Sequence, residues 1–425
     1  MILTDLQTAY ASDHKPALRV REEAEGGVVF DPQSGVITRV NDDELERLQR
    51  DARENPEIVY YAIQQWSTAP LAAGCTASPN RIYLEVTSRC NLHCAFCYRN
   101  AGDPGTAEVE TPAMIELIRM IARVGVHELR ITGGEPTMRP DLLQLLDEAL
   151  TAGLYVSLGT NGVWPAGFHD ALPGRKIGRY LVSLDGTPEI HEALRGEGTF
   201  APALKTIDVL VSAGQSVRIN TILSRRGLAH LDEFLMLCGQ HGVSHVALIV
   251  PRPIGRASQH AVEHALPGPG DLEAVARRIV SLEYQYGVAI EFQYNCYRNA
   301  VPGRTSDPVI QKVRACPVGR EAAFLTPEGY LYACGCAVEW LTQPAWRSYI
   351  AAGQVDIRDP ASLWRLWQQA PVWESFRNLQ RSKAPSCFTC DYYGHGCFGS
   401  CPIHALLVYG AMNAEDPMCW VRNGG

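Results

Sequence analysis

The chain lacks a long apolar run and an excess of basic residues, and both absences narrow its possible functions. No stretch of its 425 residues approaches the roughly 18 consecutive apolar residues of a membrane-spanning helix. The first residues have neither the basic start nor the apolar core of a secretory signal. Lys and Arg total 38 against 46 Asp and Glu, so no positive field favours nucleic acid. We therefore expect a cytoplasmic protein with no membrane or nucleic-acid partner.

Cysteine, in contrast, is plentiful. Fourteen cysteines in a large chain without an export signal indicate metal or redox chemistry rather than a disulfide framework. The remaining composition, 46% hydrophobic and 20% charged, is that of an ordinary globular protein with room for two or three domains.

Three of these cysteines stand together after a short apolar strand predicted at residues 83–87. Cys90, Cys94 and Cys97 have the spacing C-x3-C-x2-C. Thiolates at this spacing can hold one face of a 4Fe-4S cluster from a single loop, and a set of three leaves one iron open to a small molecule. The alternatives are a zinc site with a distant fourth ligand, or unrelated buried cysteines.

From residue 81 to about 292 the chain alternates predicted strands and helices. Thr111 and Pro112 are placed to begin a helix, and Gly125 to follow its end. The strands are predicted at 83–87, 128–132, 155–159, 180–184, 217–222, 245–250 and 288–292. This alternation predicts an α/β fold, a parallel sheet with outer helices that curls into a partial (β/α)6 TIM-like barrel. Ligands of such folds bind at the carboxyl ends of the strands.

Two polar segments follow strands of this predicted sheet. In Gly133-Gly-Glu-Pro136 the glycines allow the backbone to approach a ligand, and Glu135 can face a cation, although the segment could also be a simple turn. Arg195 follows the strand at 180–184, and its guanidinium suits a carboxylate. His191 could relay a proton or fix the loop to Asp185.

The cysteine loop, the Gly-Gly-Glu-Pro segment and the Ser-Leu-Asp-Gly segment at residues 183–186 together resemble the radical S-adenosylmethionine (SAM) enzymes. The resemblance implies that the three cysteines hold a catalytic 4Fe-4S cluster with SAM at its open iron, and that Phe96 lies along the adenine. It also implies that residues 133–136 hold the methionyl ammonium of SAM, through Gly133, Gly134 and Glu135. Ser183 and Arg195 would bind its carboxylate.

Seven of the cysteines in the last third of the chain form an ordered pattern: Cys316, Cys334, Cys387, Cys390, Cys397, Cys401 and Cys419. A zinc ribbon would explain only the four from 387 to 401. Their order, including a glycine five residues before Cys334, resembles the SPASM extension of radical SAM enzymes, with one extra residue before Cys397.

That resemblance implies two auxiliary 4Fe-4S clusters and therefore three clusters in all. One would be held by Cys387, Cys390, Cys397 and Cys419. The other would be held by Cys316, Cys334 and Cys401, with Cys336, Cys296 or an open iron in the fourth place. Cys238, on a helical apolar face, is expected in the core.

The first 75 residues differ from the rest. Short strands are predicted at 17–22, 27–30 and 36–40, followed by a helix capped by Asn41 and a second helix at 56–65. This order resembles the small α+β, winged-helix-like recognition element of enzymes that modify ribosomally made peptides. A cap on one end of the barrel is the alternative. We expect three domains, at 1–75, 76–295 and 296–425.

The resemblances imply a radical SAM/SPASM peptide maturase. A 5′-deoxyadenosyl radical would take hydrogen from a side-chain carbon of a precursor peptide, and a carbon-carbon or carbon-heteroatom bond would form as an auxiliary cluster accepts an electron. Flavodoxin or ferredoxin would supply electrons, and the N-terminal domain would bind the leader. Alternatives are oxidation of a small molecule such as an aminocyclitol, sulfatase maturation, disfavoured because Gly335 replaces an aspartate, or a non-catalytic iron-sulfur protein.

Overall fold

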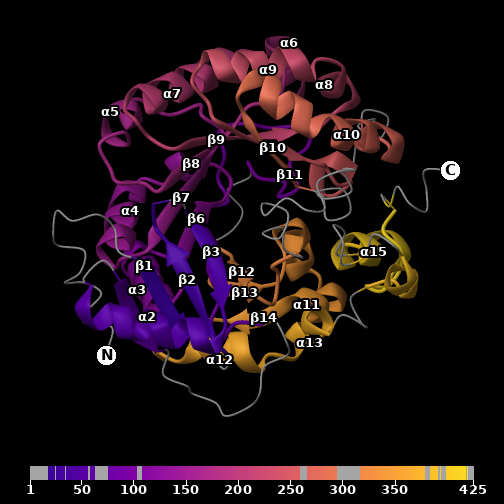
Figure 1. Ribbon diagram of the computed structural model, residues 1–425. Helices are drawn as coiled ribbons and strands as arrows, with labels where there is room; N and C mark the ends of the chain where they lie inside the picture. Colours follow the sequence, from indigo (N-terminus) through magenta and orange to yellow (C-terminus); the bar gives the residue numbers. More distant parts are fainter. Residues whose placement is uncertain are drawn as a thin grey trace.

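A curved sheet with helices along its outer side forms the centre of the protein, as a computed structural model shows (Figure 1). The structure describes residues 18–23, 25–33, 35–55, 58–62, 75–102, 108–258, 266–293, 316–378, 383–390, 393, 399–417 and 419. Among these residues no helix has both the length and the apolar character needed to cross a membrane.

Residues 18–62 form a separate four-stranded sheet with one helix. In the order β3-β2-β1-β4, its strands are β3 (Val36–Val40), β2 (Gly27–Asp31), β1 (Leu18–Glu22) and β4 (Ile58–Ala62). Helix α2 (Asp42–Glu54) begins with a capping box, in which Asn41 Oδ1 accepts from Glu44 N and Glu44 accepts from Asn41 N. The first three predicted strands and the Asn41 cap are confirmed.

The second helix predicted for this region, at 56–65, is wrong where the structure describes it. Residues 58–62 are a strand that pairs in parallel with β1. The segment Ile-Val-Tyr-Tyr is rich in β-branched and aromatic residues, which favour a strand once a neighbouring strand is present.

Seven parallel strands follow, each within two residues of its predicted position. They are β5 (Arg81–Glu85), β6 (Glu128–Thr132), β7 (Tyr155–Thr160), β8 (Arg179–Ser183), β9 (Val217–Ile222), β10 (His245–Ile249) and β11 (Ala289–Gln293). Each pairs in parallel with the next along the chain, which confirms the α/β fold with a parallel sheet.

The helices that connect these strands lie outside the curve of the sheet (Figure 1). They are α3 (Thr111–Arg123), α4 (Leu142–Thr151), α5 (Phe168–Ala171), α6 (Pro188–Arg195), α7 (Phe200–Ser212), α8 (Arg225–Ala229), α9 (Leu231–Gln240) and α10 (Pro269–Tyr286). Short 3-10 turns follow β6 and β10, at η1 (Pro136–Met138) and η2 (Gly255–Ser258).

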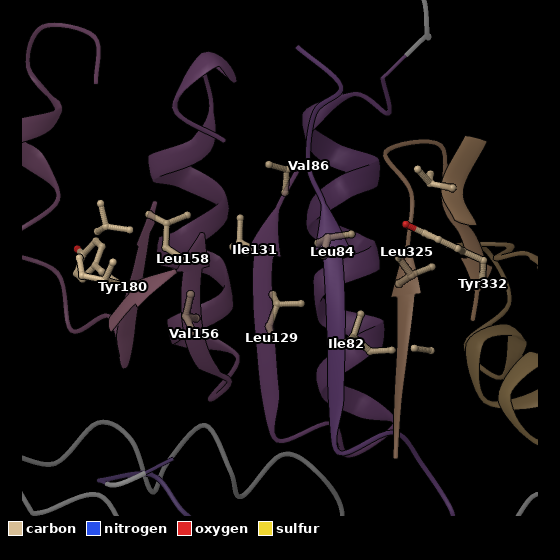
Figure 2. Packing of buried hydrophobic residues seen from close by; sticks show 14 of the residues in the cluster. Ile82, Leu84, Val86, Leu129, Ile131, Val156, Leu158, Tyr180, Leu325 and Tyr332 are labelled. Atoms are coloured by element: carbon tan, nitrogen blue, oxygen red, sulfur yellow. The ribbon is translucent and has the colours of Figure 1, made fainter. Parts of the chain in front are cut away.

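The two faces of the curved sheet differ in polarity. Alternate residues such as Ile82, Leu129 and Val156 are buried among the apolar side chains of the core (Figure 2). Because successive side chains of a strand point to opposite faces, their neighbours Arg81 and Glu128 lie on the inner face. Parallel strands covered by helices on both faces are usually apolar on both. Here the inner face is polar.

The C-terminal third adds three strands to the same sheet, which the sequence analysis did not predict. Strand β12 (Ala322–Leu325) pairs in parallel with β5, and β13 (Tyr330–Tyr332) and β14 (Ala351–Gln354) follow in antiparallel order. The remaining elements are η5 (Gly335–Thr342), α11 (Pro344–Ile350), α12 (Ser362–Gln369), η6 (Pro371–Trp373), α13 (Glu374–Arg377), η7 (Pro385–Thr389) and α15 (Pro402–Tyr409).

Arg21 joins the N-terminal sheet to the amino end of the barrel strands. Its buried guanidinium donates to Gly125 O at 2.6 Å and to Asn80 Oδ1 at 2.6 Å, just before β6 and β5 respectively. Phe30 of β2 stacks on His127, with 5.3 Å between ring centroids. The N-terminal sheet is therefore packed against the end of the curved sheet opposite to the cysteine loop.

We predict that Arg21→Met destabilises the protein strongly. The substitution removes the donors to the barrel carbonyls and leaves the buried Glu23, which pairs with Arg21 at 2.7 Å, without its cation. Breaking a buried pair in this way costs about 3–5 kcal/mol. Urea denaturation measures the change in unfolding free energy.

The matched control is Arg39→Met, which breaks the more exposed pair between Arg39 and Glu321 at the same junction. Its cost should be about 0–1 kcal/mol. Equal losses in the two variants would contradict the importance of Arg21.

Candidate metal and cofactor site

The loop that carries Cys90, Cys94 and Cys97 follows β5 and is held by loops at the carboxyl ends of other strands. Gly134 N donates to Thr87 O at 2.8 Å, from the loop after β6. Ala95 N donates to Leu194 O at 2.9 Å, at the end of α6. The segments that the sequence analysis placed at this end of the barrel therefore meet around the three cysteines.

Gly133 and Gly134 are needed for contact between two loops. A Cβ atom at Gly134 would lie 2.1 Å from Arg89 O, and one at Gly133 would lie 2.3 Å from Thr87 O. Gly133 also has a φ of 151°, which favours glycine. We predicted that these glycines let the backbone approach a ligand. The structure gives them a nearer partner, the backbone of the cysteine loop, and ligand contact stays a prediction.

Glu135 is fully buried, and its carboxylate accepts several hydrogen bonds. Its Oε1 accepts from Thr137 Oγ1 at 2.8 Å and Thr160 Oγ1 at 2.9 Å, and its Oε2 accepts from Asn161 N at 2.7 Å. Burial raises the pKa of Glu135, and these hydrogen bonds oppose the rise. The carboxylate thus ties the loop after β6 to the end of β7. The predicted contact with a cation stays a prediction.

Hydrogen-bond donors point at two of the three sulfur atoms. Cys90 Sγ accepts from Leu92 N at 3.5 Å and from Asn161 Nδ2 at 3.9 Å, and Cys94 Sγ lies 4.0 Å from Arg195 Nη1. Burial raises the pKa of Cys90 to about 11. A buried thiol with such donors loses its proton readily only when a metal ion compensates the charge.

This donor set fits an iron-sulfur cluster. Cys90, Cys94 and Cys97 are all free of disulfides, and they lie near enough for their charges to interact. Across the described residues, no three His, Cys, Asp or Glu side chains gather around a single metal ion. A cubic cluster requires a wider spacing, because each cysteine binds a different iron.

Arg195, which we predicted to bind the carboxylate of SAM, is paired with Asp185. Its Nε donates to Asp185 Oδ2 at 2.5 Å, while Asp185 Oδ1 accepts from Ile222 N at 2.7 Å. Asp185 N donates to His191 Nδ1 at 3.1 Å, and burial lowers the pKa of His191 to about 4. Of the two roles considered for His191, the structure therefore supports the fixing of the loop to Asp185.

Ser183 and Phe96 occupy the predicted region as well. Ser183 ends β8 and Phe96 lies inside the cysteine loop, and both are half-buried. Their contacts with SAM stay predictions.

Arg256 is a site residue that the sequence analysis missed. Its Nε donates to Cys94 O at 2.8 Å, and its backbone N donates to Cys97 O at 3.0 Å. The preceding Gly255 has a φ of 63°, and a Cβ there would lie 2.3 Å from Cys97 O. A Gly-Arg pair a few residues after the strand at 245–250 is the signal that could have indicated it.

Glu85 connects the cysteine loop to the C-terminal third, and it too was missed. The buried carboxylate pairs with Arg99 Nη2 at 2.7 Å and accepts from Tyr332 Oη at 2.8 Å. Arg99 follows Cys97 by two residues, and Tyr332 precedes Cys334 by two. One carboxylate thus positions both cysteine segments.

Cys334 interacts with three other cysteines of the C-terminal third, namely Cys316, Cys336 and Cys401, and Cys401 also interacts with Cys316. Cys334 donates a hydrogen bond to Cys336, and this hydrogen bond lowers the pKa of the Cys336 thiol. Of the candidates for a fourth ligand, Cys336 therefore lies beside Cys334, one of the three predicted ligands. Cys296 lies outside the described residues.

The other predicted cluster is described only in part. Cys387, Cys390 and Cys419 are half-buried and form no disulfide, whereas Cys397 lies outside the described residues. A Cβ at Gly399 would lie 3.4 Å from Cys387 Sγ. Cys238 is buried in α9, as expected for a core residue, and burial raises its pKa to about 12.

Similarity to known proteins covers the part of the chain that carries this site. Residues 84–235 match the Radical SAM superfamily. The chain is 28% identical over 342 residues to the mycofactocin maturase MftC of Mycobacterium tuberculosis, covering 79% of this chain and 81% of that protein. It is 27% identical over 349 residues to the PqqA peptide cyclase of Ruegeria pomeroyi, covering 80% and 87%.

A solved structure shares the fold over nearly the whole chain. The crystal structure of Streptococcus suis SuiB bound to precursor peptide SuiA matches with a TM-score of 0.73 at 15% identity, covering 95% of this chain and 99% of that one. This match shows the fold.

We predict that Gly134→Ala disrupts the cysteine loop. The new methyl group would meet Arg89 O at 2.1 Å, so one of the two loops must move. Overpacking of this kind costs about 1–3 kcal/mol or more. The iron retained after anaerobic reconstitution should fall in parallel with stability, and both can be measured on the purified chain.

Gly174→Ala is the matched control, because nothing lies within 4 Å of a Cβ at Gly174. It should change stability by less than about 0.5 kcal/mol and leave iron content unchanged. Wild-type iron content in Gly134→Ala would show that the close approach is dispensable.

Proposed function

We propose that this chain, which carries a radical SAM domain, is a maturase of a ribosomally made peptide. The observation that carries the proposal is the similarity, over about four fifths of the chain, to proteins named as a peptide maturase and a peptide cyclase. The fold of SuiB, solved with a precursor peptide, agrees with it. The reaction would form a carbon-carbon or carbon-heteroatom bond at a side-chain carbon of the peptide.

We infer that Cys90, Cys94 and Cys97 hold the 4Fe-4S cluster that the radical SAM domain implies. When bound, this cluster and SAM supply a 5′-deoxyadenosyl radical that removes hydrogen from an unactivated carbon. The chain contributes positioning, since Asn161 and Arg195 direct N–H groups at the sulfur atoms and stabilise their negative charge.

We propose that SAM binds between the cysteine loop and the loops that contact it. Ser183 and Arg195 at the carboxyl end of the barrel would bind the carboxylate, and Arg195 already lies beside Cys94 Sγ. Gly133, Gly134 and Glu135 would hold the ammonium, with the buried Glu135 fixing the backbone around it.

Two auxiliary clusters form part of the proposal. The interactions of Cys334 with Cys316, Cys336 and Cys401 support one four-cysteine cluster. Cys387, Cys390, Cys397 and Cys419 would hold the other, as their spacing suggests. Flavodoxin or ferredoxin would be the reductant, and the protein would work in the cytoplasm.

One feature disfavours the alternative of sulfatase maturation. The position after Cys334, where those enzymes carry an aspartate, is Gly335. A Cβ at Gly335 would lie 2.8 Å from Phe324 Cε1, so the ring of Phe324 fills the space of a longer side chain. Another base would be required for that chemistry here.

The N-terminal sheet offers an edge for the leader of the peptide. Strand β3 ends the sheet order β3-β2-β1-β4 and is partly exposed along its length. A strand at the edge of a sheet can bind an extended peptide through main-chain hydrogen bonds. We propose that the leader pairs with β3.

Changing Cys90, Cys94 and Cys97 together to Ala tests the first cluster. The triple variant should lose about four irons per chain and all SAM cleavage, because these thiolates are the only protein ligands proposed for that cluster. Iron analysis and assay of 5′-deoxyadenosine measure both. Cys238→Ala, in the core of α9, is the control and should keep its iron. An unchanged iron content in the triple variant would refute the assignment.

Single prolines at Ile37 and Thr38 test the β3 edge. Successive N–H groups of an edge strand point alternately toward the neighbouring strand β2 and away from it, so one of the two variants removes a donor on the outer edge and keeps the hairpin. That variant should keep its melting temperature and its uncoupled SAM cleavage.

The affinity of that proline variant for the short peptide encoded nearest to the enzyme's gene should fall at least about tenfold. An added strand is held by main-chain hydrogen bonds, and the variant lacks one of the donors. Fluorescence anisotropy of a labelled peptide measures this. If the variant with unchanged melting binds that peptide as tightly as wild type, the leader does not pair with β3.

A further inference from the structure

The loop after β10 contacts the cysteine loop through one buried arginine. Arg256 is 4% exposed, and its side chain donates from Nε to Cys94 O at 2.8 Å and from Nη1 to Ala101 O at 2.8 Å. The backbone N of the same residue donates to Cys97 O at 3.0 Å. Arg256 therefore contacts both ends and the middle of the segment from Cys94 to Ala101.

The backbone on both sides of this contact has a special conformation. Asn100 accepts from Arg256 Nη1 at 3.2 Å and has a φ of 53°. Such left-handed backbone is uncommon outside glycine, although asparagine tolerates it. Gly255 has a φ of 63°, and a Cβ there would lie 2.7 Å from Tyr98 O. The two loops therefore meet in one defined geometry, with the guanidinium group fixed beside the cysteine segment.

Hydrogen bonds to carbonyl oxygens do not by themselves require a charged donor. A neutral amide can donate to a carbonyl oxygen, and burying it costs less free energy than burying a guanidinium. A buried cation is favourable where negative charge lies close to it. The three thiolates of the loop and the cluster that we propose for them carry net negative charge, and reduction adds an electron to it. Arg256 is placed to stabilise that charge.

A carboxylate of the C-terminal third also lies within reach of the charge on Arg256. Burial raises the pKa of Glu339, and the charges of Arg99 and Arg256 oppose the rise. Glu339 is half-buried in η5, three residues after Cys336. Loss of the Arg256 charge would therefore leave this carboxylate less compensated, and the surroundings of the cysteine loop would become more negative for two reasons.

We propose that Arg256 is a positioning residue whose positive charge makes the first cluster easier to reduce. The inference rests on the proposed function, because it requires a cluster held by Cys90, Cys94 and Cys97. The guanidinium group bonds to the carbonyl of Cys94 itself, so its field stabilises the electron that the reduced cluster gains. The alternative is a residue that only holds the loop in place through its hydrogen bonds.

Potentiometric titration followed by electron paramagnetic resonance tests the charge, on the full-length protein with its clusters. The first cluster is identified as the signal that is missing from the triple cysteine variant. Arg256→Gln keeps a donor and loses the charge. At a given potential, the ratio of reduced to oxidised first cluster should fall at least about tenfold in this variant, equivalent to about 59 mV for one electron. Arg256→Lys keeps the charge and should stay close to wild type.

The matched control is Arg89→Gln, the same change directly before Cys90. The Arg89 side chain is 38% exposed and pairs with Glu108 at 2.9 Å. Because solvent and salt screen an exposed charge, this variant should keep the potential of the first cluster. An equal shift in Arg89→Gln and Arg256→Gln would show that the potential follows the overall charge of the protein, and it would overturn the proposal.

Iron retention decides the question if Arg256→Gln keeps too little of the first cluster for titration. Arg256→Lys should then retain more iron than Arg256→Gln. Equal behaviour of these two variants, in potential or in retained iron, would leave Arg256 with a purely structural role. A wild-type protein with no signal missing from the triple cysteine variant is a different result, because it would refute the cluster assignment itself.

Discussion

The close backbone contact between the loops after β5 and β6 is the constraint on which the rest of the site depends. Gly134 lies so near Arg89 that no side chain fits between them. This contact brings Glu135 under the cysteine loop, where its hydrogen bond to Asn161 N places the Asn161 amide beside Cys90. The Gly-Gly-Glu-Pro motif, which the sequence suggests is ligand-binding, therefore acts first on the protein itself. It fixes the conformation of the loop that carries the three cysteines.

A second buried carboxylate, that of Glu85, holds one cysteine segment next to another. Glu85 ends the strand before the first set of cysteines and bonds to Tyr332, just before Cys334. Removing water from this carboxylate raises its pKa, and Arg99 and Tyr332 counteract the rise. The two cysteine regions are therefore held at a defined separation by a single buried group.

Local sequence patterns predicted the parts of the fold that depend on interactions between residues close together in the chain. Strands β6 and β9 and the cap at Asn41 follow from alternation of strands and helices and from capping chemistry. What the sequence did not reveal depends on partners distant in the chain. Residues 58–62 become a strand because β1 is beside them, and Arg256 reaches Cys94 O across more than 150 residues. No local pattern records such pairings.

The pairing of β12 with β5 has a consequence for the order in which the protein can assemble. Arg81 of β5 lies opposite Ala322 of β12, so one edge of β5 lacks this partner until residues 322–325 have left the ribosome. At about 5–20 residues per second, that interval is on the order of tens of seconds. During that interval the strand leading to the first cysteines is thus exposed along one edge, and pairing with β12 covers it.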